Sequence, residues 1–536
     1  MLEAGGLAVA LTAVAALVYG PHAVHGGFIS DAWTWRAVYE FAPGDGFLQS
    51  TQYLMDQPNM EARPLYAIYL SLLNAAFGPH MGFWLGFSVA LGVVMSICVF
   101  LLLRELTIPP LDAAAIAVLV LLFPASSSLR FWAATPGSQL TIALVALGFV
   151  AALRGFAARG RTRLVLHGVS LALFVTSVLL YEIALGVLLA SVLVYRLCVP
   201  WRAAVSRWLV DCAVLVPLAV LAATRSPEDF FPRQDSQGIW NHVTLIWEQA
   251  RTLLTTVVLP FGSDSWYVVA LLALVPATAA LVAARLPPSD PARAALRRSL
   301  IVVAGGLAVV ILGYAVFVPT LDTYSPMAPG IFDRVNALPS VGWSLLVYGL
   351  IMLAAKLACR GLPDAPRLTS GLAAVTCAIV VASWLGTLAD DADGYTRAYE
   401  KSQRVLDTVR RTVPEPAANS TIWTFGQPAE LDTGYTVFAG YWEMTDAVRL
   451  AYDDPTLASY VGYPGTTFQC EAREIVPRGH VYYDSPGELY KGTDWYVRSF
   501  ASAYGSTYFV DTRADRAERI DTPTQCRRAS RSFPRA

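Results

Sequence analysis

The sequence predicts a mainly α-helical, polytopic transmembrane bundle with a C-terminal extracytoplasmic domain that is α/β or β-rich. Of its 536 residues, 55% are hydrophobic and only 15% are charged, and the mean hydropathy is +0.48. So few charges cannot cover a soluble chain of this length. Many windows hold about 20 largely apolar residues, the length that crosses a bilayer. Near residue 390 these windows end and the sequence becomes rich in Asp, Arg, Tyr, Gly and Thr.

The charge balance and the cysteine pattern exclude several classes of function. Lys and Arg number 39 and Asp and Glu 40, a net charge of −1, so no basic field exists to hold nucleic acid. We therefore expect no nucleic-acid partner. The seven Cys residues form no CxxC pair and no Cys/His cluster, which argues against zinc and iron–sulfur sites. A nucleotide-driven soluble enzyme is disfavoured, because no phosphate-binding lysine loop occurs.

The predicted spans are identified by length, because a helix in lipid must satisfy its own backbone groups. About eleven are predicted, at residues 3–20, 80–103, 112–125, 138–153, 164–181, 183–199, 208–224, 264–285, 299–319, 338–358 and 369–389. The apolar segment 64–78 is shorter, and counting it as a span would reverse the side of every later basic loop. We interpret it as an interfacial or re-entrant helix, and 239–260 as a second interfacial helix. The first span lacks the cationic start of a signal peptide, so we expect it to be retained.

Lys and Arg in the short connections set the expected orientation, because they bias a connection toward the cytoplasm. Four connections are basic, namely 154–163, 196–207, 285–298 and 356–367. The alternate connections carry at least as many acids as bases, at 21–63, 225–263 and 320–336. This pattern predicts that the N-terminus lies inside, that lipids surround residues 1–390, and that 391–536 form an outer domain. The Ala, Val and Arg bias favours a GC-rich genome, and we expect a bacterial cytoplasmic membrane protein.

The outer domain is predicted to open with a helix at 391–411 and to continue with short strands. Strand-like runs occur at 421–425, 435–439, 480–483 and 507–511. Its two cysteines, Cys470 and Cys526, would lie in an oxidising compartment, so we expect a disulfide between them, with two unpaired thiols as the alternative. Four aromatic residues are candidates either for glycan binding or for the core of the domain: Trp423, Tyr441, Trp442 and Trp495.

The long outer loop 21–63 carries the first candidate functional residue, Asp31. The loop is too long for a simple connection, and its aromatic residues suit a membrane interface. A carboxylate at headgroup depth is able to accept a proton from an acceptor hydroxyl or to bind a divalent cation. The alternative is that Asp31 is the N-cap of a helix that begins at Ala32.

Three arginines are predicted at the same outer level. Arg63 precedes the short helix 64–78, Arg130 follows the third span, and Arg334 precedes the tenth. A guanidinium at this depth binds a phosphate bidentately or extends to the interface without a ligand. Together the three would form an anion site, whereas each alone means little. Glu182 lies in an apolar run, where exposure to lipid is costly, so it has either a functional role or an arginine partner.

These features resemble the GT-C superfamily of polytopic glycosyltransferases, above all its protein O-mannosyltransferase and lipid A aminoarabinose transferase branches. The resemblance covers roughly residues 1–390 and rests on four elements of the sequence. They are Asp31 in the first outer loop, Arg63-Pro64-Leu65-Tyr66 through Phe77-Gly78, Tyr181-Glu182, and the Arg-x-x-x-Leu-Pro-Ser-x-Gly pattern from Arg334 to Gly342.

The resemblance implies an inverting transfer of a sugar from a polyprenyl-phosphate donor to a glycan, lipid or protein acceptor at the outer membrane face. Asp31 and Glu182 would be the catalytic residues, with Asp31 as general base or as a ligand for Mg²⁺ or Mn²⁺. Arg63 would hold the donor phosphate, assisted by Arg130 or Arg334. Tyr66 and Tyr181 would contact the acceptor.

The first loop departs from the family pattern, in which two adjacent acids often occur, because Ala32 follows Asp31. Either Glu40 or Asp45 replaces the second acid, or no metal is used. Three other functions stay open: a transporter or flippase of lipid-linked saccharides, a polymerase or ligase that consumes an oligosaccharide diphosphate lipid, and a structural assembly protein.

Overall fold

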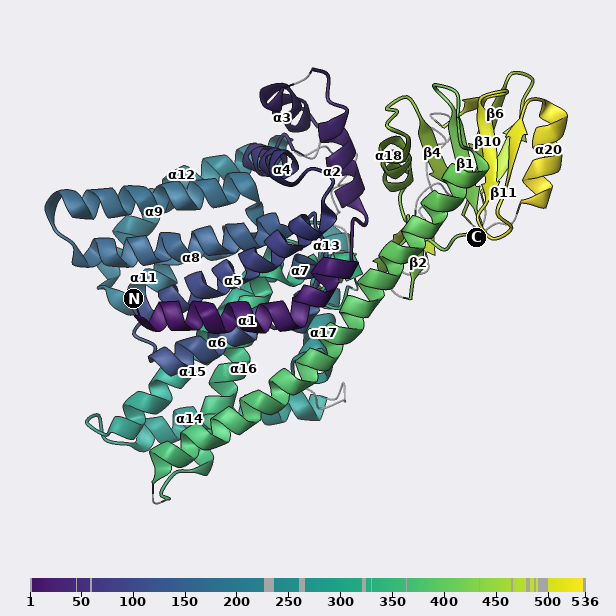
Figure 1. Ribbon diagram of the computed structural model, residues 1–536. Coiled ribbons are helices and arrows are strands. Elements are labelled where there is room, and N and C mark those ends of the chain that lie inside the picture. Colours follow the sequence, from purple (N-terminus) through teal and green to yellow (C-terminus); the bar gives the residue numbers. More distant parts are fainter. Residues whose placement is uncertain are drawn as a thin grey trace.

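A computed structural model shows a helical bundle and a mixed α/β domain that are connected by one long helix (Figure 1). The structure describes residues 2–44, 46–57, 60–225, 236–259, 266–320, 324–328, 330–362, 364–432, 434–463, 466–478, 483–485, 488–489 and 500–533. The predicted fold class is confirmed. The outer domain was predicted to be either α/β or β-rich, and the structure shows an α/β domain.

Within these residues, nine helices are long and apolar enough to cross a membrane. They are α1 (Leu2–His25), α5 (Met81–Glu105), α8 (Pro136–Ala157), α9 (Gly160–Leu180), α12 (Trp201–Arg225), α14 (Trp266–Arg285), α15 (Pro291–Ala315), α16 (Ala337–Ala358) and α17 (Ala365–Thr412). Each corresponds to a predicted span. The protein is therefore an integral membrane protein.

Two predicted spans, 112–125 and 183–199, are built from shorter pieces. The first covers most of α6 (Pro110–Leu121) and the start of η1 (Pro124–Ser126), and a further short helix, α7 (Ser128–Phe131), follows it. Pro124 ends α6 because it lacks an N–H group and restricts the residue before it. The second consists of η2 (Glu182–Ala184), α10 (Leu185–Leu189) and α11 (Ser191–Cys198). The number of eleven crossings stays a prediction.

The bundle has two chemically different ends. At one end Arg104 approaches Glu3 to 3.7 Å, and Arg154 pairs with Glu105 at 2.6 Å, which brings together the start of α1 and the ends of α5 and α8. Lys356, in the last turn of α16, lines a groove together with Ile108 and Pro109, which follow α5, so it lies at the same end; we call this the basic end. At the opposite end, the loop end, lie α2 (Asp31–Glu40), α3 (Phe47–Met55) and α4 (Pro64–Phe77) (Figure 1).

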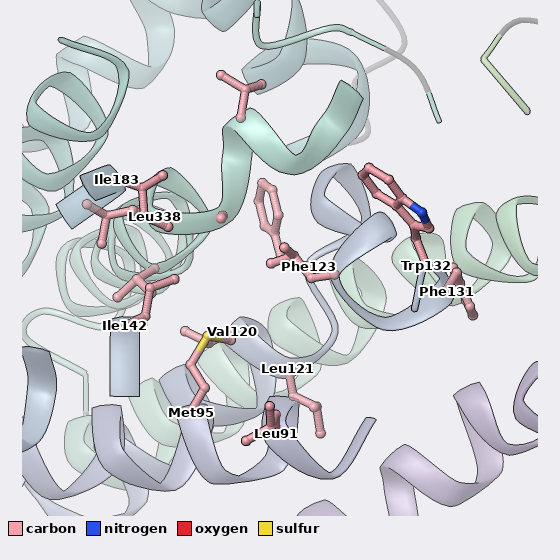
Figure 2. Packing of buried hydrophobic residues seen from close by; sticks show 14 of the residues in the cluster. Leu91, Met95, Val120, Leu121, Phe123, Phe131, Trp132, Ile142, Ile183 and Leu338 are labelled. Carbon is pink, nitrogen blue, oxygen red and sulfur yellow. The ribbon is translucent and has the colours of Figure 1, made fainter. Parts of the chain in front are cut away.

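Helix α4 has 14 residues, about 21 Å, so it is too short to cross the roughly 30 Å of hydrocarbon. It packs on α3 and on α9 at the loop end. The segment 239–260, predicted as a second interfacial helix, corresponds to α13 (Ser236–Leu253) followed by η3 (Leu254–Val258). The core that supports the loop end is packed from α5, α6 and α8, where Met95, Val120 and Ile142 meet (Figure 2).

The C-terminal domain is built on a four-stranded sheet of order β11-β10-β1-β4. These strands are β1 (Thr421–Phe425), β4 (Ala458–Val461), β10 (Thr507–Asp511) and β11 (Arg516–Ile520). Strand β1 is parallel to both β10 and β4, and all five of its residues are buried. Such burial on both faces is typical of a central parallel strand. Trp423 is therefore a core residue and not a glycan contact.

Shorter elements complete the domain. A three-stranded sheet contains β5 (Thr467–Cys470), β6 (Glu474–Arg478) and β9 (Ser502–Ala503), and two strand pairs join β2 (Glu430–Leu431) to β3 (Tyr435–Thr436) and β7 (Tyr483–Ser485) to β8 (Glu488–Leu489). The helices are α18 (Tyr441–Tyr452) and α20 (Pro523–Ser532). The predicted strand at 435–439 is only two residues long. Residues 480–482 and Trp495 lie outside the described residues.

Helix α17 joins the two parts. The sequence predicted a span at 369–389 and a separate helix at 391–411, but the two are one helix of 48 residues, about 72 Å. No proline interrupts it after its first turn, so the backbone hydrogen bonds continue from the bundle into the domain. The domain is therefore carried on a continuous helix.

The disulfide predicted between Cys470 and Cys526 is present, and it ties β5 to α20 across a separation of 56 residues. We expect the double substitution C470S/C526S to lower the stability of the C-terminal domain by roughly 4 kcal/mol, because the open chain regains loop entropy. Thermal unfolding of the full chain, followed by tryptophan fluorescence, measures the loss. Cys198→Ser, at an exposed free cysteine, is the control and should leave the transition unchanged. Equal transitions in all three proteins would contradict the expectation.

Candidate active site

The candidate site lies at the loop end, where Arg63 pairs with Glu182. Arg63 Nε donates to Glu182 Oε2 at 2.9 Å, and a second bond joins Nη2 to Oε1. Arg63 precedes Pro64, which opens α4, and Glu182 follows the break between α9 and η2. The extended backbone of Tyr181 (φ −164°, ψ 125°) makes this break and turns Glu182 out of the apolar run. Glu182 therefore has the arginine partner that was one of its two predicted roles.

Aromatic rings surround this ion pair. The guanidinium of Arg63 lies 4.4 Å from the centre of the Tyr181 ring. The rings of Tyr66 and Tyr181 are stacked at 6.4 Å, and the Tyr66 hydroxyl donates to the carbonyl of Ala134. A Cβ on Gly137 would lie 2.4 Å from the Tyr66 ring, so only glycine leaves room for it. Tyr66 and Tyr181 thus form one wall of the site, and their contact with an acceptor stays a prediction.

Arg334 approaches the same site from η4 (Gly330–Asn336). Its Nη2 donates to the hydroxyl of Tyr324 at 3.0 Å, and its guanidinium lies 5.2 Å from the centre of the Trp132 ring. Its Nε is buried and has no hydrogen-bond partner in the part of the chain that the structure describes. An unused donor on a buried cation is costly, and an anionic ligand would satisfy it.

Asp31 is the first residue of α2 and lies at the junction of the bundle and the C-terminal domain. Burial raises the pKa of its carboxyl group, and the charge of Arg334 and a hydrogen bond from Trp442 oppose that rise. Trp442 Nε1 donates to Asp31 Oδ1 at 3.3 Å. The N-cap of α2 is Ser30, and no side chain caps the helix, so the alternative role of Asp31 as an N-cap is wrong.

The C-terminal domain supplies two residues to this junction, Trp442 and Glu443, from the first turn of α18. A Cβ on Gly440 would lie 2.7 Å from the Trp442 ring, so this glycine allows the ring to fold toward Asp31. Glu443 is 2% exposed and its Oε2 accepts from the backbone N–H of Ala439 at 2.9 Å. Burial and the nearby charge of Asp31 raise the pKa of Glu443 to about 8.

Glu443 was missed by the sequence reasoning, although a signal existed. It occupies the third position of α18, from which a glutamate side chain returns to the N–H groups before the helix, as in a capping box. Trp442 had been considered as a glycan-binding or core residue, and its contact with Asp31 was not foreseen.

Arg130 does not join the cluster, which corrects its predicted assignment to the anion site. It is fully buried in α7, where its Nη2 donates to the carbonyl of Phe123 at 2.7 Å. Its guanidinium also lies 5.4 Å from the centre of the Tyr19 ring. Ser126 Oγ also donates to this carbonyl, at 3.5 Å, and the Nε and Nη1 of Arg130 have no hydrogen-bond partner among the described residues. Arg130 thus ties α7 to the residue that precedes η1.

A metal ion finds too few ligands at Asp31. Within the described ranges, no three His, Cys, Asp or Glu side chains are grouped so that they could hold one. Glu40 pairs with Arg36 on the same helix, and Asp45 lies outside the described residues. Asp31 and Glu443 offer two carboxylates, one of which has a pKa near 8. The reaction proposed for this site therefore involves no metal ion.

Comparison with known proteins gives similarity in fold only. No protein-family model and no curated protein matches the chain. The crystal structure of an Archaeoglobus fulgidus oligosaccharyltransferase, tethered to an acceptor peptide, is 12% identical with a TM-score of 0.39, and the match covers 83% of this chain and 63% of that one. The chain thus spans less than two thirds of its length. ArnT from Cupriavidus metallidurans, in the apo state, is 15% identical with a TM-score of 0.36 over 85% and 86% of the two chains.

At these TM-scores and identities the case for a function has to rest on the geometry of the site itself.

The raised pKa of Glu443 makes a prediction about stability and pH. The folded group, with a pKa of about 8, keeps a proton that the unfolded group, with an ordinary value of 4.5, has lost. Stability contributed at this position therefore falls as the pH rises from about 4.5 to about 8, and is constant above that. Glu443→Gln should remove this component, so the melting temperature of the variant should rise relative to the wild type between pH 5 and pH 8.

Thermal unfolding of the full chain across pH 5 to 9 measures this difference. Glu415→Gln, at an exposed glutamate that follows α17, is the matched control and should follow the wild type at each pH. A constant offset between Glu443→Gln and the wild type would show that Glu443 is ionised throughout.

Proposed function

We propose that this protein is an inverting glycosyltransferase that moves a sugar from a polyprenyl-phosphate donor to the hydroxyl of a glycan, lipid or protein acceptor. The observation that carries the proposal is the proximity of a partly buried carboxylate, Asp31, to a partly buried arginine, Arg334, whose buried Nε has no hydrogen-bond partner among the described residues. The carboxylate of Asp31 can act as a base, and the guanidinium of Arg334 can bind an anion. Transfer from a phosphate donor to a hydroxyl group needs both. We place the reaction at the outer face of a bacterial cytoplasmic membrane.

The donor phosphate is assigned to the two arginines of the cluster. The departing oxygen of a polyprenyl phosphate gains negative charge as the sugar bond breaks, and fixed cations stabilise that charge. Arg334 has a free Nε for this purpose. Arg63 already donates two bonds to Glu182, so the phosphate would share this guanidinium with the glutamate or displace it. In this proposal Glu182 is a positioning residue for Arg63, whereas the family resemblance implied a catalytic role for Glu182.

Asp31 is assigned the role of general base. Its carboxylate takes the proton of the acceptor hydroxyl while the hydroxyl oxygen bonds to the anomeric carbon and polyprenyl phosphate leaves from the opposite face. A single displacement of this kind inverts the anomeric centre. Glu443, with a pKa of about 8, would be mostly protonated at pH 7, so Asp31 is the carboxyl group of the pair that is assigned the role of base. Tyr66, Tyr181 and Trp442 supply flat faces for sugar rings.

Transport of a lipid-linked saccharide is the alternative function, and it requires charged groups inside the bundle. One such pair exists, Arg207 and Asp211, at 2.8 Å in α12. Tyr195 donates to Asp211 at 2.6 Å and Arg207 donates to Ser170 at 3.3 Å, so both charges have partners from neighbouring helices. The pair is explained by helix packing and does not favour transport.

The first test of the proposal is the Asp31→Asn variant. Purified full-length protein, given a panel of synthetic polyprenyl-phosphate sugars and an acceptor extract, should release polyprenyl phosphate. Asp31→Asn should lower kcat by roughly 10²- to 10⁴-fold, because the base is lost. Asp56→Asn, at an exposed aspartate of the same outer loop, should retain activity. Full activity of the Asp31→Asn protein would rule out the assigned base.

The second test concerns the phosphate. Arg63→Gln and Arg334→Gln should each raise KM for the donor by roughly 10- to 100-fold, since each removes charge-assisted hydrogen bonds to the phosphate. The KM for the acceptor should change little. Arg404→Gln, at an exposed arginine on the outer part of α17, is the control for a general loss of charge. If the donor KM is the same in all four proteins, the phosphate does not bind at these arginines.

A further inference from the structure

A groove of about 430 Å³ opens at the basic end of the bundle, between the start of α6, the start of α15, the end of α16 and the start of α17. Its size lies within the roughly 300–1,000 Å³ of ligand-binding pockets. Figure 1 shows these four helix ends at the side of the bundle away from α2 and the C-terminal domain. The groove has no part in the proposed transfer reaction.

The distance between the groove and the candidate active site is set by α16. Arg334 precedes this helix, and Lys356 and Arg360, which line the groove, lie at its other end. The helix has 22 residues and is about 33 Å long. Because the hydrocarbon core is about 30 Å thick, the two sites lie at the headgroup depths of opposite leaflets.

The groove carries an excess of positive charge. Three cations line it, Arg298, Lys356 and Arg360, against one carboxylate among the described lining residues, Asp112. The Tyr348 hydroxyl donates to Asp112 at 2.8 Å. The lining therefore has a net charge of about +2 at the depth where lipid phosphates lie.

The central cation is held in a fixed position. Lys356 Nζ donates to the Ala295 carbonyl at 3.1 Å and to Ser299 Oγ at 2.7 Å. These bonds orient the ammonium between α15 and α16. Arg298 and Arg360 are exposed and line the same groove, so their side chains are free to turn toward an anion bound at Lys356.

The rest of the lining is apolar, and the surface beside it is apolar too. Leu296, Val302 and Met352 form the wall of the groove. Next to it in the sequence, Leu111 is 84% exposed on α6 and Leu368 is 47% exposed on α17. A soluble anion makes no use of such surfaces, whereas acyl chains continue from a bound headgroup along them.

We infer that this groove binds one anionic phospholipid, with its phosphate at Arg298, Lys356 and Arg360 and its acyl chains along α15 and α17. The inference is independent of the proposed glycosyl transfer. Charge complementarity selects the anionic headgroup, and the apolar wall with its depth in the membrane selects a lipid over a free phosphate.

The test measures lipid binding to the full-length protein in an uncharged detergent by native mass spectrometry. Phosphatidylglycerol should bind with a stoichiometry of one at concentrations where phosphatidylcholine of the same acyl chains does not. The double variant R298Q/R360Q should weaken this binding roughly 30-fold, at about a factor of five for each arginine. Both arginines are exposed, so folding should be unaffected, which thermal unfolding without lipid checks.

The matched control is R297Q/R367Q, which removes two exposed charges from α15 and α17 outside the groove. It should bind phosphatidylglycerol as the wild type does. Equal weakening in both double variants would show a diffuse attraction to the basic end and would overturn the proposal. Equal binding of phosphatidylcholine would overturn it as well.

A second variant tests the shape of the groove with its charges intact. Ala292→Trp places a large ring in the groove and should weaken binding, whereas Ala294→Trp, exposed on the same helix outside the groove, should not. Inorganic phosphate at millimolar concentration should not compete with the lipid. If it does compete, the groove binds soluble anions and the assignment to a phospholipid is wrong.

Discussion

The partly buried carboxylate of Asp31 organises the loop end of this protein. A buried charge is stable only if other groups replace the water it has lost. For Asp31 those groups come from two distant parts of the chain, Arg334 of the bundle and Trp442 of the C-terminal domain. Glu443 adds a second carboxyl group, which burial keeps protonated over much of the neutral range. The site is complete only when the domain rests on α2, so the domain is part of the site and not an appendage.

The three arginines of the loop end differ in the hydrogen bonds that their guanidinium groups make and in their exposure. Arg130 is fully buried and donates from Nη2 to the carbonyl of Phe123, while its Nε and Nη1 have no hydrogen-bond partner among the described residues. Arg63 is bound by a carboxylate on two atoms, and Arg334 by one tyrosine hydroxyl, which leaves a buried donor unsatisfied. Arg130 and Arg334 thus both have unpaired donors within the described part of the chain, and Arg334 is the candidate phosphate ligand because it is only partly buried and lies near Asp31 and Tyr181.

Much of the architecture could be predicted from the sequence, because hydropathy and the positions of Lys and Arg are local properties. Single features of the sequence pointed to four site residues. A long outer loop pointed to Asp31 and a following proline to Arg63. An acid in an apolar run pointed to Glu182, and a match to the family pattern pointed to Arg334. Their partners could not be found in that way. Asp31 and Trp442 are 411 residues apart in the sequence, and only the folded chain shows that they meet.

The same limit explains the error at Arg130 and the unexpected continuity of α17. Whether an arginine faces a ligand or a carbonyl depends on where the preceding helix ends in space. Two helical segments form one helix when no residue between them breaks the backbone hydrogen bonds. In α17 the change from apolar to polar residues near position 390 resembles a boundary in the sequence, but the helix continues through it.

The α15 and α16 pair connects the two ends of the molecule. A Cβ on Gly342 would lie 2.7 Å from the carbonyl oxygen of Gly306, so the helices touch through their backbones. At the loop end, the hydroxyl of Tyr314 on α15 donates to Asn336, two residues after Arg334. At the basic end, Lys356 of α16 donates to α15. One tightly packed helix pair thus fixes a cation at each headgroup depth. A substitution that separates these helices in mid-membrane would displace both cations, although it would touch neither.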